Sequence, residues 1–378
     1  MAVDEKPVCE AYSQEYRREF FRLCLVPGVG PVLRERLLEY FGDPNQIFAA
    51  PPSELVGVAG VGPSVVKSIT SAIGEIDVDA EFQLCREHGI DISLCIDSNY
   101  PKRLQEIPAP PGVLFIHGSL VPQDDLAIAI VGTRGCSNYG RRQARRFGRE
   151  LSERGVTVVS GLARGIDGSA HRAALEVGGR TIAVLGGGIL RIYPPEHRPL
   201  AAQISQSGAV VSEYPPLRPS LRSTFPQRNR LISGLSWGVL VVEAPARSGS
   251  LVTARHATEQ NREVMAIPGP VDRATFQGSH RLLKDGAQLI EHPAEVLESL
   301  GPLPAATEHT GRQVRHPAEL NLSEQEQQVL DVIGSEPTRI DAIISSSDLP
   351  SNRVLSTLSI LEVRQLVHRV SGQFVVRR

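Results

Sequence analysis

The segment with the clearest chemistry combines an aromatic ring with cationic and amide side chains. Six successive residues form it, namely Phe225, Pro226, Gln227, Arg228, Asn229 and Arg230. A ring can stack on a nucleobase while neighbouring guanidinium groups bind phosphates, and a single nucleic-acid strand needs both contacts. One stacked base contributes roughly 1–3 kcal/mol by alanine substitution. The segment therefore predicts a site for single-stranded DNA, with Phe225 as the stacking residue.

Short glycine turns form a second group of candidate binding residues. One comprises Gly132, Thr133 and Arg134, and another begins with Ser160 and Gly161. Small residues at the start of a helix let backbone amides approach an anion closely. A third turn, 186–188, has contiguous glycines, so it does not match the dinucleotide fingerprint, and no Walker sequence occurs. The turns predict contacts to phosphate rather than a nucleotide cofactor.

Arginines are concentrated in the helix expected after the first of these turns. Six arginines lie between residues 134 and 149 with no acid among them. Their i, i+4 spacing keeps most of them on one broad face of a helix. That face suits a phosphate backbone, or it is a solvated face balanced by acids elsewhere in the fold. Arg134, at the end of a strand, is the strongest candidate for binding.

The segment from Glu243 to Ala254 offers hydroxyls but no catalytic machinery. Ser250 and Thr253 could bind a phosphate, or they could simply cap a helix. Glu243 has no second carboxylate near it in the sequence, and neither an activated nucleophile nor a metal cluster is recognisable. We expect no catalytic residue, no metal and no cofactor, and hence a protein that is not an enzyme.

Alternating strands and helices position these turns. Short apolar runs predict strands at 126–131, 156–159, 181–185, 209–211, 239–242 and 264–267. Continuous apolar runs are typical of strands covered on both faces, and helix-length spacers between them favour a doubly wound, mostly parallel sheet. Ligands of such sheets bind beyond the carboxyl ends of the strands, where the glycine turns are expected.

Two smaller domains flank this α/β core in the prediction. Residues 1–84 contain Gly-Val-Gly twice, at 28–30 and 60–62, each before a helical apolar pattern, as in a helix-hairpin-helix or SAM-like domain. Residues 85–300 form the Rossmann-like core, and 301–318 read as a linker. Residues 319–378 predict three helices and a hairpin, the outline of a winged helix. The repeated hairpins either contact a DNA phosphate through their glycine amides or are a compact helical unit without a ligand, and the winged helix is expected to bind either DNA or protein; few cations lie on their expected recognition helices.

The length, composition and net charge of the chain limit the class of protein it can be. The chain has 378 residues, 41% of them hydrophobic, and a net charge of −2, which argues against a surface basic throughout. Its five cysteines show no paired spacing, so reduced thiols are expected. No segment approaches the ~20 apolar residues of a membrane span. We therefore expect a cytoplasmic protein without membrane contact.

Taken in order, the motifs closely resemble the DprA/Smf family of DNA processing proteins. The matching pieces are 129–134, 160–167 with Ala170-His171, 212–216, 225–236, 248–254 and 282–287. The set covers about 200 residues in the same order and spacing, and both flanking domains look like optional domains of that family. Departures are His280, where Asn is common, and Arg364, where Gly is common.

The resemblance implies an extended Rossmann-like core that binds single-stranded DNA in a basic pocket and forms homodimers. It also implies loading of the RecA recombinase during natural transformation. The DNA-contacting positions of the family correspond to Gly132–Arg134, Ser160–Gly161 and Phe225–Arg230. One alternative is a nucleotide-processing enzyme of the lysine-decarboxylase-like type, although its Pro-Gly-Gly-x-Gly-Thr loop is absent. A third hypothesis places DNA binding mainly in the terminal domains.

Overall fold

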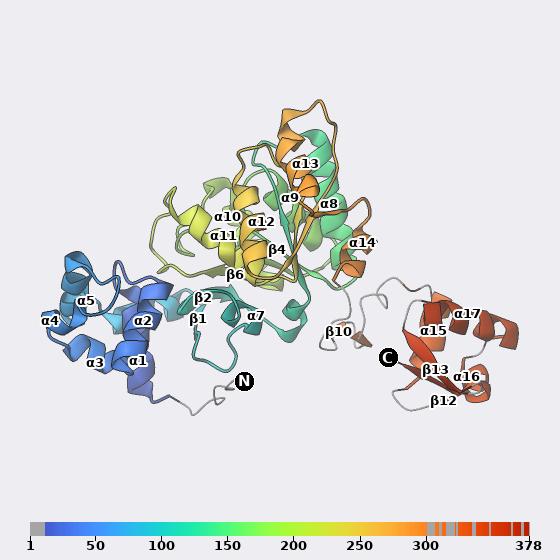
Figure 1. Cartoon of the computed structure of the whole chain (residues 1–378), viewed down its shortest axis with the longest axis horizontal. Helices are drawn as coiled ribbons and strands as arrows, with labels where there is room; N and C mark the ends of the chain where they lie inside the picture. Colours follow the sequence, from blue (N-terminus) through green and yellow to red (C-terminus); the bar gives the residue numbers. More distant parts are fainter. Residues whose placement is uncertain are drawn as a thin grey trace.

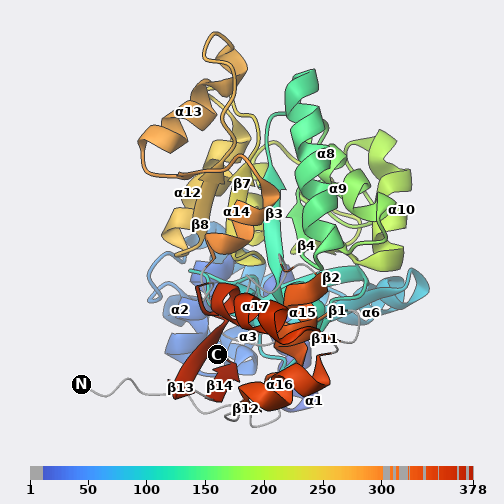
Figure 2. The same ribbon diagram turned by 90° about the vertical axis from the view of Figure 1, so that its right-hand side faces the viewer.

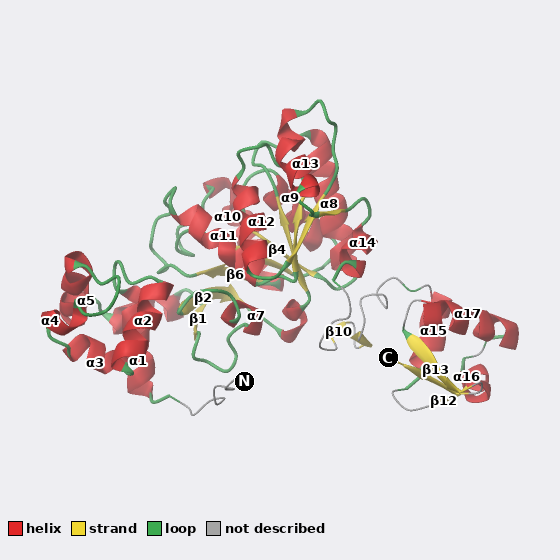
Figure 3. Cartoon of the chain, in the orientation of Figure 1, coloured by secondary structure: helices red, strands yellow, loops and turns green. Residues whose placement is uncertain are grey.

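The computed structural model describes residues 12–300 continuously and most of the C-terminal part in shorter stretches (Figure 1). The latter are 307–309, 312–314, 322, 324–334, 338–347, 349–363, 366–371 and 374–377. The predicted linker at 301–318 therefore lies largely outside the described residues, as do Ser323 and Arg364. Figure 3 shows a helical N-terminal part, a central α/β part and a small mixed C-terminal part.

The N-terminal part is helical, as predicted. Its helices are α1 (Gln14–Leu25), α2 (Pro31–Phe41), α3 (Pro44–Ala49), α4 (Pro52–Leu55), α5 (Pro63–Glu75) and α6 (Val78–Glu87). The two glycine turns pack against each other's helices: a Cβ at Gly28 would meet Val65 of α5, and one at Gly60 would meet Leu33 of α2. Both glycines have positive φ, which L side chains rarely adopt. The repeated motif thus builds one compact pair of hairpins.

The central sheet has nine strands in the order β1-β2-β6-β5-β4-β3-β7-β8-β9. The strands are β1 (Ile90–Leu94), β2 (Val113–Gly118), β3 (Ala127–Val131), β4 (Thr157–Ser160), β5 (Thr181–Val184), β6 (Ala209–Ser212), β7 (Gly238–Val241), β8 (Glu263–Ala266) and β9 (Gln288–Leu289). Strands β3 to β9 are parallel. The predicted doubly wound sheet and its six strands are confirmed. The hairpin β1-β2 extends the sheet beyond the prediction, with β2 antiparallel to β6 and β1 antiparallel to β2.

Helices cover both faces of this sheet, and alternating side chains of β3 contact them. Ala127, Ala129 and Val131 pack with residues of α11 and α12. Ile128 and Ile130 pack with residues of α8, α9 and α14 on the other face. Figure 2 shows α8 and α9 on one side of β3 and α12 on the other. The helices are α7 (Lys102–Gln105), α8 (Asn138–Glu153), α9 (Ile166–Glu176), α10 (Arg198–Ser207), α11 (Thr224–Gly234), α12 (Gly249–Glu259), α13 (Gln277–Lys284) and α14 (Pro293–Glu298).

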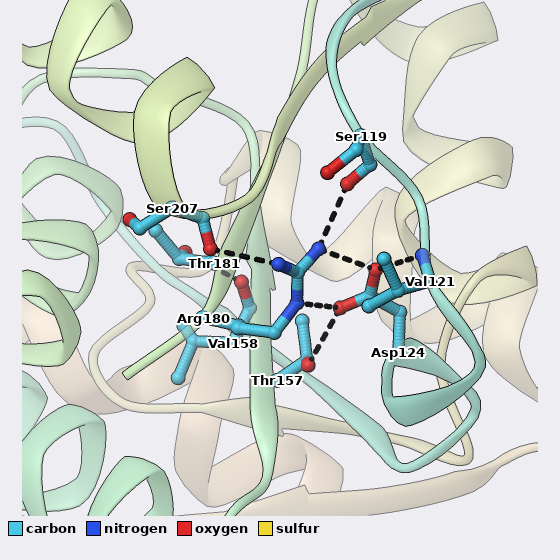
Figure 4. Close-up of polar contacts among 8 residues, drawn as sticks. All are labelled: Ser119, Val121, Asp124, Thr157, Val158, Arg180, Thr181 and Ser207. Carbon is cyan, nitrogen blue, oxygen red and sulfur yellow. Dashed lines mark hydrogen bonds and ion pairs between the residues drawn. The ribbon is translucent and has the colours of Figure 1, made fainter. Parts of the chain in front are cut away.

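An ion-pair network ties together the amino-terminal ends of the strands (Figure 4). Arg180, just before β5, binds Asp124 with two guanidinium nitrogens at 2.8 Å each. It also donates to the carbonyls of Ser119 and Ser207. Asp124 accepts from the Thr157 hydroxyl at the start of β4 as well. Since the glycine turns singled out in the sequence follow the other ends of the strands, this network serves the fold.

The helical part packs on the core through the β1-β2 hairpin. Phe20 and Phe21 of α1 share one buried cluster with Phe115 of β2, and the rings of Phe21 and Phe115 lie 6.0 Å apart. Arg34 of α2 donates to the carbonyl of Pro110 over 2.8 Å. The sheet extension that the sequence patterns did not reveal is therefore the contact surface for this domain.

The C-terminal part has the predicted winged-helix elements. They are α15 (Glu324–Asp331), β12 (Thr338–Arg339), α16 (Ile340–Ser346), α17 (Ser351–Val363), β13 (Val367–Ser371) and β14 (Phe374–Arg377). Strands β13 and β14 pair antiparallel, and β12 joins β14. Val329, Ile343, Leu358 and Val375 are among the residues of its own buried cluster. A short hairpin, β10 (Thr307–His309) and β11 (Arg312–Val314), precedes it.

Candidate nucleic-acid interface

Strand order reverses between β3 and β7. From β3 the chain builds one half of the parallel sheet through β4, β5 and β6, and the other half through β7, β8 and β9. A crevice forms at such a reversal, beyond the carboxyl ends of the two central strands. Gly132–Arg134 directly follow β3, and Glu243 follows β7. The first glycine turn thus lies where a doubly wound sheet binds its ligands.

A cavity of about 300 Å³ occupies this position, and we call it the rim pocket. Its lining comes from the loops after β3, β4 and β7 and from the first turns of α11 and α12. Nine of the predicted site residues line it: Gly132, Thr133, Arg134, Phe225, Pro226, Arg228, Asn229, Ser250 and Thr253. Segments far apart in the sequence therefore meet at one site, and Arg247 joins them.

Arg134 and Phe225 form the exposed face of the pocket. The Arg134 guanidinium carbon lies 5.1 Å from the centre of the Phe225 ring. Arg134 is exposed and Phe225 half-buried, so both remain accessible. Tyr193, 43% exposed, lies on the other side with its ring centre 5.8 Å from that of Phe225. Tyr193 could not be predicted from the sequence because nothing near it in the chain marks a site; only the fold brings the two rings together.

Arg228 is buried, whereas the sequence predicted an accessible cation. It is 4% exposed and donates to the carbonyls of Gly161, at 2.8 Å, and Val184. Burial lowers its pKa to about 10. Burial also raises the pKa of the neighbouring Asp167 carboxyl, which accepts from the backbone N–H groups of Gly161 and Ala163. Arg228 thereby joins the ends of β4 and β5 beneath the Phe225 ring, 5.9 Å from its centre.

Two members of the predicted run lie on the other side of α11. Arg230 forms an ion pair with Glu213 and donates to the Ala109 carbonyl over 3.0 Å. Gln227 accepts from the Tyr214 hydroxyl over 3.0 Å. Both line a different cavity, between the core and the helical domain. A helix turns its successive side chains by about 100°, so one segment cannot present all six residues to one pocket.

The remaining predicted residues have internal partners. The Ser160 hydroxyl is fully buried and donates to the Ile130 carbonyl over 2.6 Å. The Asn229 amide donates to the Gly249 carbonyl, and the Ser250 hydroxyl lies 2.7 Å from that of Ser248, the residue that caps α12. Thr253 is 1% exposed. A role for these residues in DNA contact stays a prediction.

Glu243 organises the loop that carries Arg134. Its fully buried carboxylate accepts from the backbone N–H and the hydroxyl of Ser137, the latter over 2.8 Å. Ser137 in turn caps α8 by accepting from the Gly140 N–H. The backbone carbonyl of Glu243 accepts from the Thr133 N–H over 2.8 Å. The acid that looked isolated in the sequence therefore holds the turn between β3 and α8 in place.

Three of the five arginines of α8 pair with acids: Arg145 and Arg149 both pair with Glu176 of α9, and Arg146 pairs with Glu150. For these three side chains the arrangement is that of a solvated face with acidic partners, and a role of the helix in DNA contact stays a prediction. Among the described residues, no group of three or more His, Cys, Asp or Glu side chains is placed to hold a metal ion. Nor does any helix within the described ranges have the length and apolar character to cross a membrane.

Fold and pocket together define a Rossmann-like protein with an arginine and two aromatic rings at its switch point, flanked by a double helical hairpin and a winged helix. Family models match in the same order: a SAM-like helix-hairpin-helix tandem at 20–75, DNA recombination-mediator protein A at 91–301 and the DprA winged helix domain at 313–373. The chain belongs to this DprA/Smf family.

Individual relatives agree with that assignment. Protein Smf of Escherichia coli is 45% identical over 73% of this chain and 74% of its own length. Protein Smf of Synechocystis is 36% identical over 93% and 96%. The structure of DNA processing protein A from Streptococcus pneumoniae has 35% identity and a TM-score of 0.64, covering 74% of this chain and 96% of its own. That from Helicobacter pylori, described for its single-stranded DNA binding mode, has 29% identity and a TM-score of 0.51, covering 56% and 95%.

Proposed function

We propose that this protein binds single-stranded DNA in the rim pocket and acts in DNA processing without catalysing a reaction. The observation that carries the proposal is the contact between the Arg134 guanidinium and the Phe225 ring at the carboxyl end of β3. A base stacked on the ring would place its phosphate beside the cation. The Helicobacter pylori relative with the same core is described as a single-stranded DNA binder, which supports the ligand class.

Labelled oligonucleotides titrated across a range of salt concentrations test this proposal. Affinity for single strands exceeds that for duplex, and it falls with salt because bound phosphates release counterions. Phe225→Ala weakens binding by about 1–3 kcal/mol, the contribution of one stacked base. Leu289→Ala, at an exposed apolar residue of β9, is the matched control. Equal affinity of the Phe225 variant and the control would reject the pocket.

The proposed biological role is recombination mediation, with loading of RecA onto incoming DNA during natural transformation. Family membership supports this proposal. RecA filament formation on single strands coated with a single-strand-binding protein is the appropriate assay, and this protein accelerates it. The proposed homodimer has a mass near 82 kDa, about twice the chain's 41.0 kDa, measurable by light scattering.

Absence of catalysis belongs to the same proposal. The acids nearest the rim pocket hold backbone and side-chain donors: Glu243 binds Ser137, and Asp167 binds the loop after β4. Neither forms a hydrogen bond to a nucleophilic side chain positioned in the pocket. Incubation with nucleoside monophosphates yields no free base. Release of a base would instead support the nucleotide-processing alternative.

A further inference from the structure

We infer that the cavity between the helical domain and the core binds a second segment of the same DNA strand, an inference that rests on the proposed function. This interdomain cavity measures about 720 Å³, more than twice the 300 Å³ of the rim pocket. Its walls are the Gly28–Gly30 turn with the start of α2 on one side, and residues around β6 and α11 on the other.

Charge in the interdomain cavity favours an anion. Three arginines line it, Arg34, Arg218 and Arg230, against the single acid Glu213. Arg230 pairs with that acid, so two positive charges remain in excess. Arg34 is 4% exposed; it donates to the neutral carbonyl of Pro110, and its charge interacts with Glu213, the acid that Arg230 already pairs with. One carboxylate does not match the charge of these arginines, and because buried cationic charge in excess is costly, a phosphate group would reduce that cost.

The walls also suit the rest of a nucleotide. The Arg218 guanidinium carbon lies 4.7 Å from the centre of the Tyr214 ring. The ring is 7% exposed and Arg218 is exposed, so the cation rather than the ring faces the ligand. Val29 of the Gly28–Gly30 turn and Val32 of α2 give the opposite wall an apolar surface. Helix α2 begins there with Gly30 as its N-cap and no side-chain cap. Its first residue, Pro31, has no N–H, so the donors without a partner within the helix are the N–H groups of Val32 and Leu33.

Helix α11 connects the two cavities. Phe225 and Pro226 line the rim pocket, whereas Gln227 and Arg230 line the interdomain cavity. Pro226 and Gln227 are both exposed, so a strand can cross the first turn of α11 from one cavity to the other. The exposed side chain of Arg222 lies just before this turn. The two sides of the segment 225–230 thus contact the same DNA strand, one in each cavity.

Oligothymidylates of stepwise increasing length, titrated against the full chain by fluorescence anisotropy, test this inference. Val32→Glu puts a negative charge at an exposed position of the cavity wall, 49% accessible in the native chain. Ile73→Glu makes the same change on α5, at a residue 58% exposed that does not line the cavity. Arg218→Ala removes a cavity cation without adding charge. Thermal unfolding of each variant confirms that it folds.

The expected result depends on length. The shortest oligonucleotide that binds is held equally by the native chain, the Val32 variant and the Ile73 variant. For longer ones, Val32→Glu weakens binding about tenfold relative to Ile73→Glu, because it opposes phosphate with like charge. Arg218→Ala acts in the same direction. If Val32→Glu and Ile73→Glu behave alike at every length, or if the loss is the same for the shortest strand, the inference is wrong. If the native chain binds no single strand, the proposed function fails instead.

Discussion

Gly186 lies directly against the ring of Phe225: a Cβ built at position 186 would be 2.9 Å from the ring carbon Cδ1. A Cβ at the neighbouring Gly187 would be 2.5 Å from the Ser220 Oγ, and one at Gly188 would be 2.2 Å from the carbonyl oxygens of Pro215 and Pro216. The three glycines after β5 therefore admit the loop that leads into α11. They thereby position Phe225, the proposed stacking residue.

A side chain at Gly186 displaces the Phe225 ring. We expect Gly186→Val to weaken single-stranded DNA binding about as much as Phe225→Ala, roughly 1–3 kcal/mol, because the ring no longer faces the pocket. The matched control is Gly74→Val on α5, where a Cβ would meet no heavy atom within 4 Å. Oligonucleotide titration of both variants decides the matter; full affinity in the Gly186 variant would contradict the positioning role.

Replacing Arg134 changes how binding depends on salt. Arg134→Ala removes one cation that faces phosphate, so we expect weaker binding for all sequences and a salt slope reduced by about 1. Arg145→Ala, whose guanidinium pairs with Glu176, serves as the control and leaves the slope unchanged. A slope that is the same in native chain and Arg134 variant would show that this guanidinium binds no phosphate.

Substitution of Glu243 is expected to lower both the stability of the fold and the affinity for DNA. Glu243→Gln keeps the size of the side chain but loses the charged acceptor of the Ser137 N–H and hydroxyl. Hydrogen bonds to charged groups contribute about 1.5–3 kcal/mol each, and we expect the free energy of unfolding to fall by about that amount. Urea unfolding measures this change. Because the loop that holds Arg134 loses its anchor, DNA affinity falls as well; native stability would contradict the anchoring role.

Acid destabilises the fold through His171. This side chain is fully buried, its Nδ1 lies 2.7 Å from the Thr181 hydroxyl, and burial lowers its pKa to about 3. The unfolded chain, with an ordinary histidine pKa of about 6.5, binds a proton that the native state excludes. Stability conferred by the neutral ring is therefore full above about pH 6.5 and is lost as the pH falls from there toward about 3.

Urea unfolding at several pH values isolates this contribution. His171 adds up to about 1.4 kcal/mol to the loss of unfolding free energy for each pH unit within that window. His171→Gln flattens the pH dependence, whatever its effect on absolute stability. His88→Gln, at an exposed histidine, leaves it unchanged. If the His171 variant retained the native slope, another group would have to account for it.

The sequence determined much about this protein by itself. Continuous apolar runs identified six strands of the sheet, and the repeated Gly-Val-Gly predicted the paired helical hairpins. Glycine turns directly after strands located the functional edge, since parallel strands carry their ends to one side. These signals are local: each follows from the spacing of apolar residues and turn residues along a few positions.

The tertiary structure decided which side chains share a site. Tyr193 reaches Phe225 from another loop, Glu243 anchors a turn that precedes it by many residues, and Arg228 and Arg230 of one helix face different surroundings. The hairpin β1-β2 was also not predicted from the sequence. Such relationships depend on the order of strands and the rotation of each helix about its axis, and no local pattern encodes either. The residue types alone indicated which contacts a site could make, but the geometry of the site depends on how distant segments pack together.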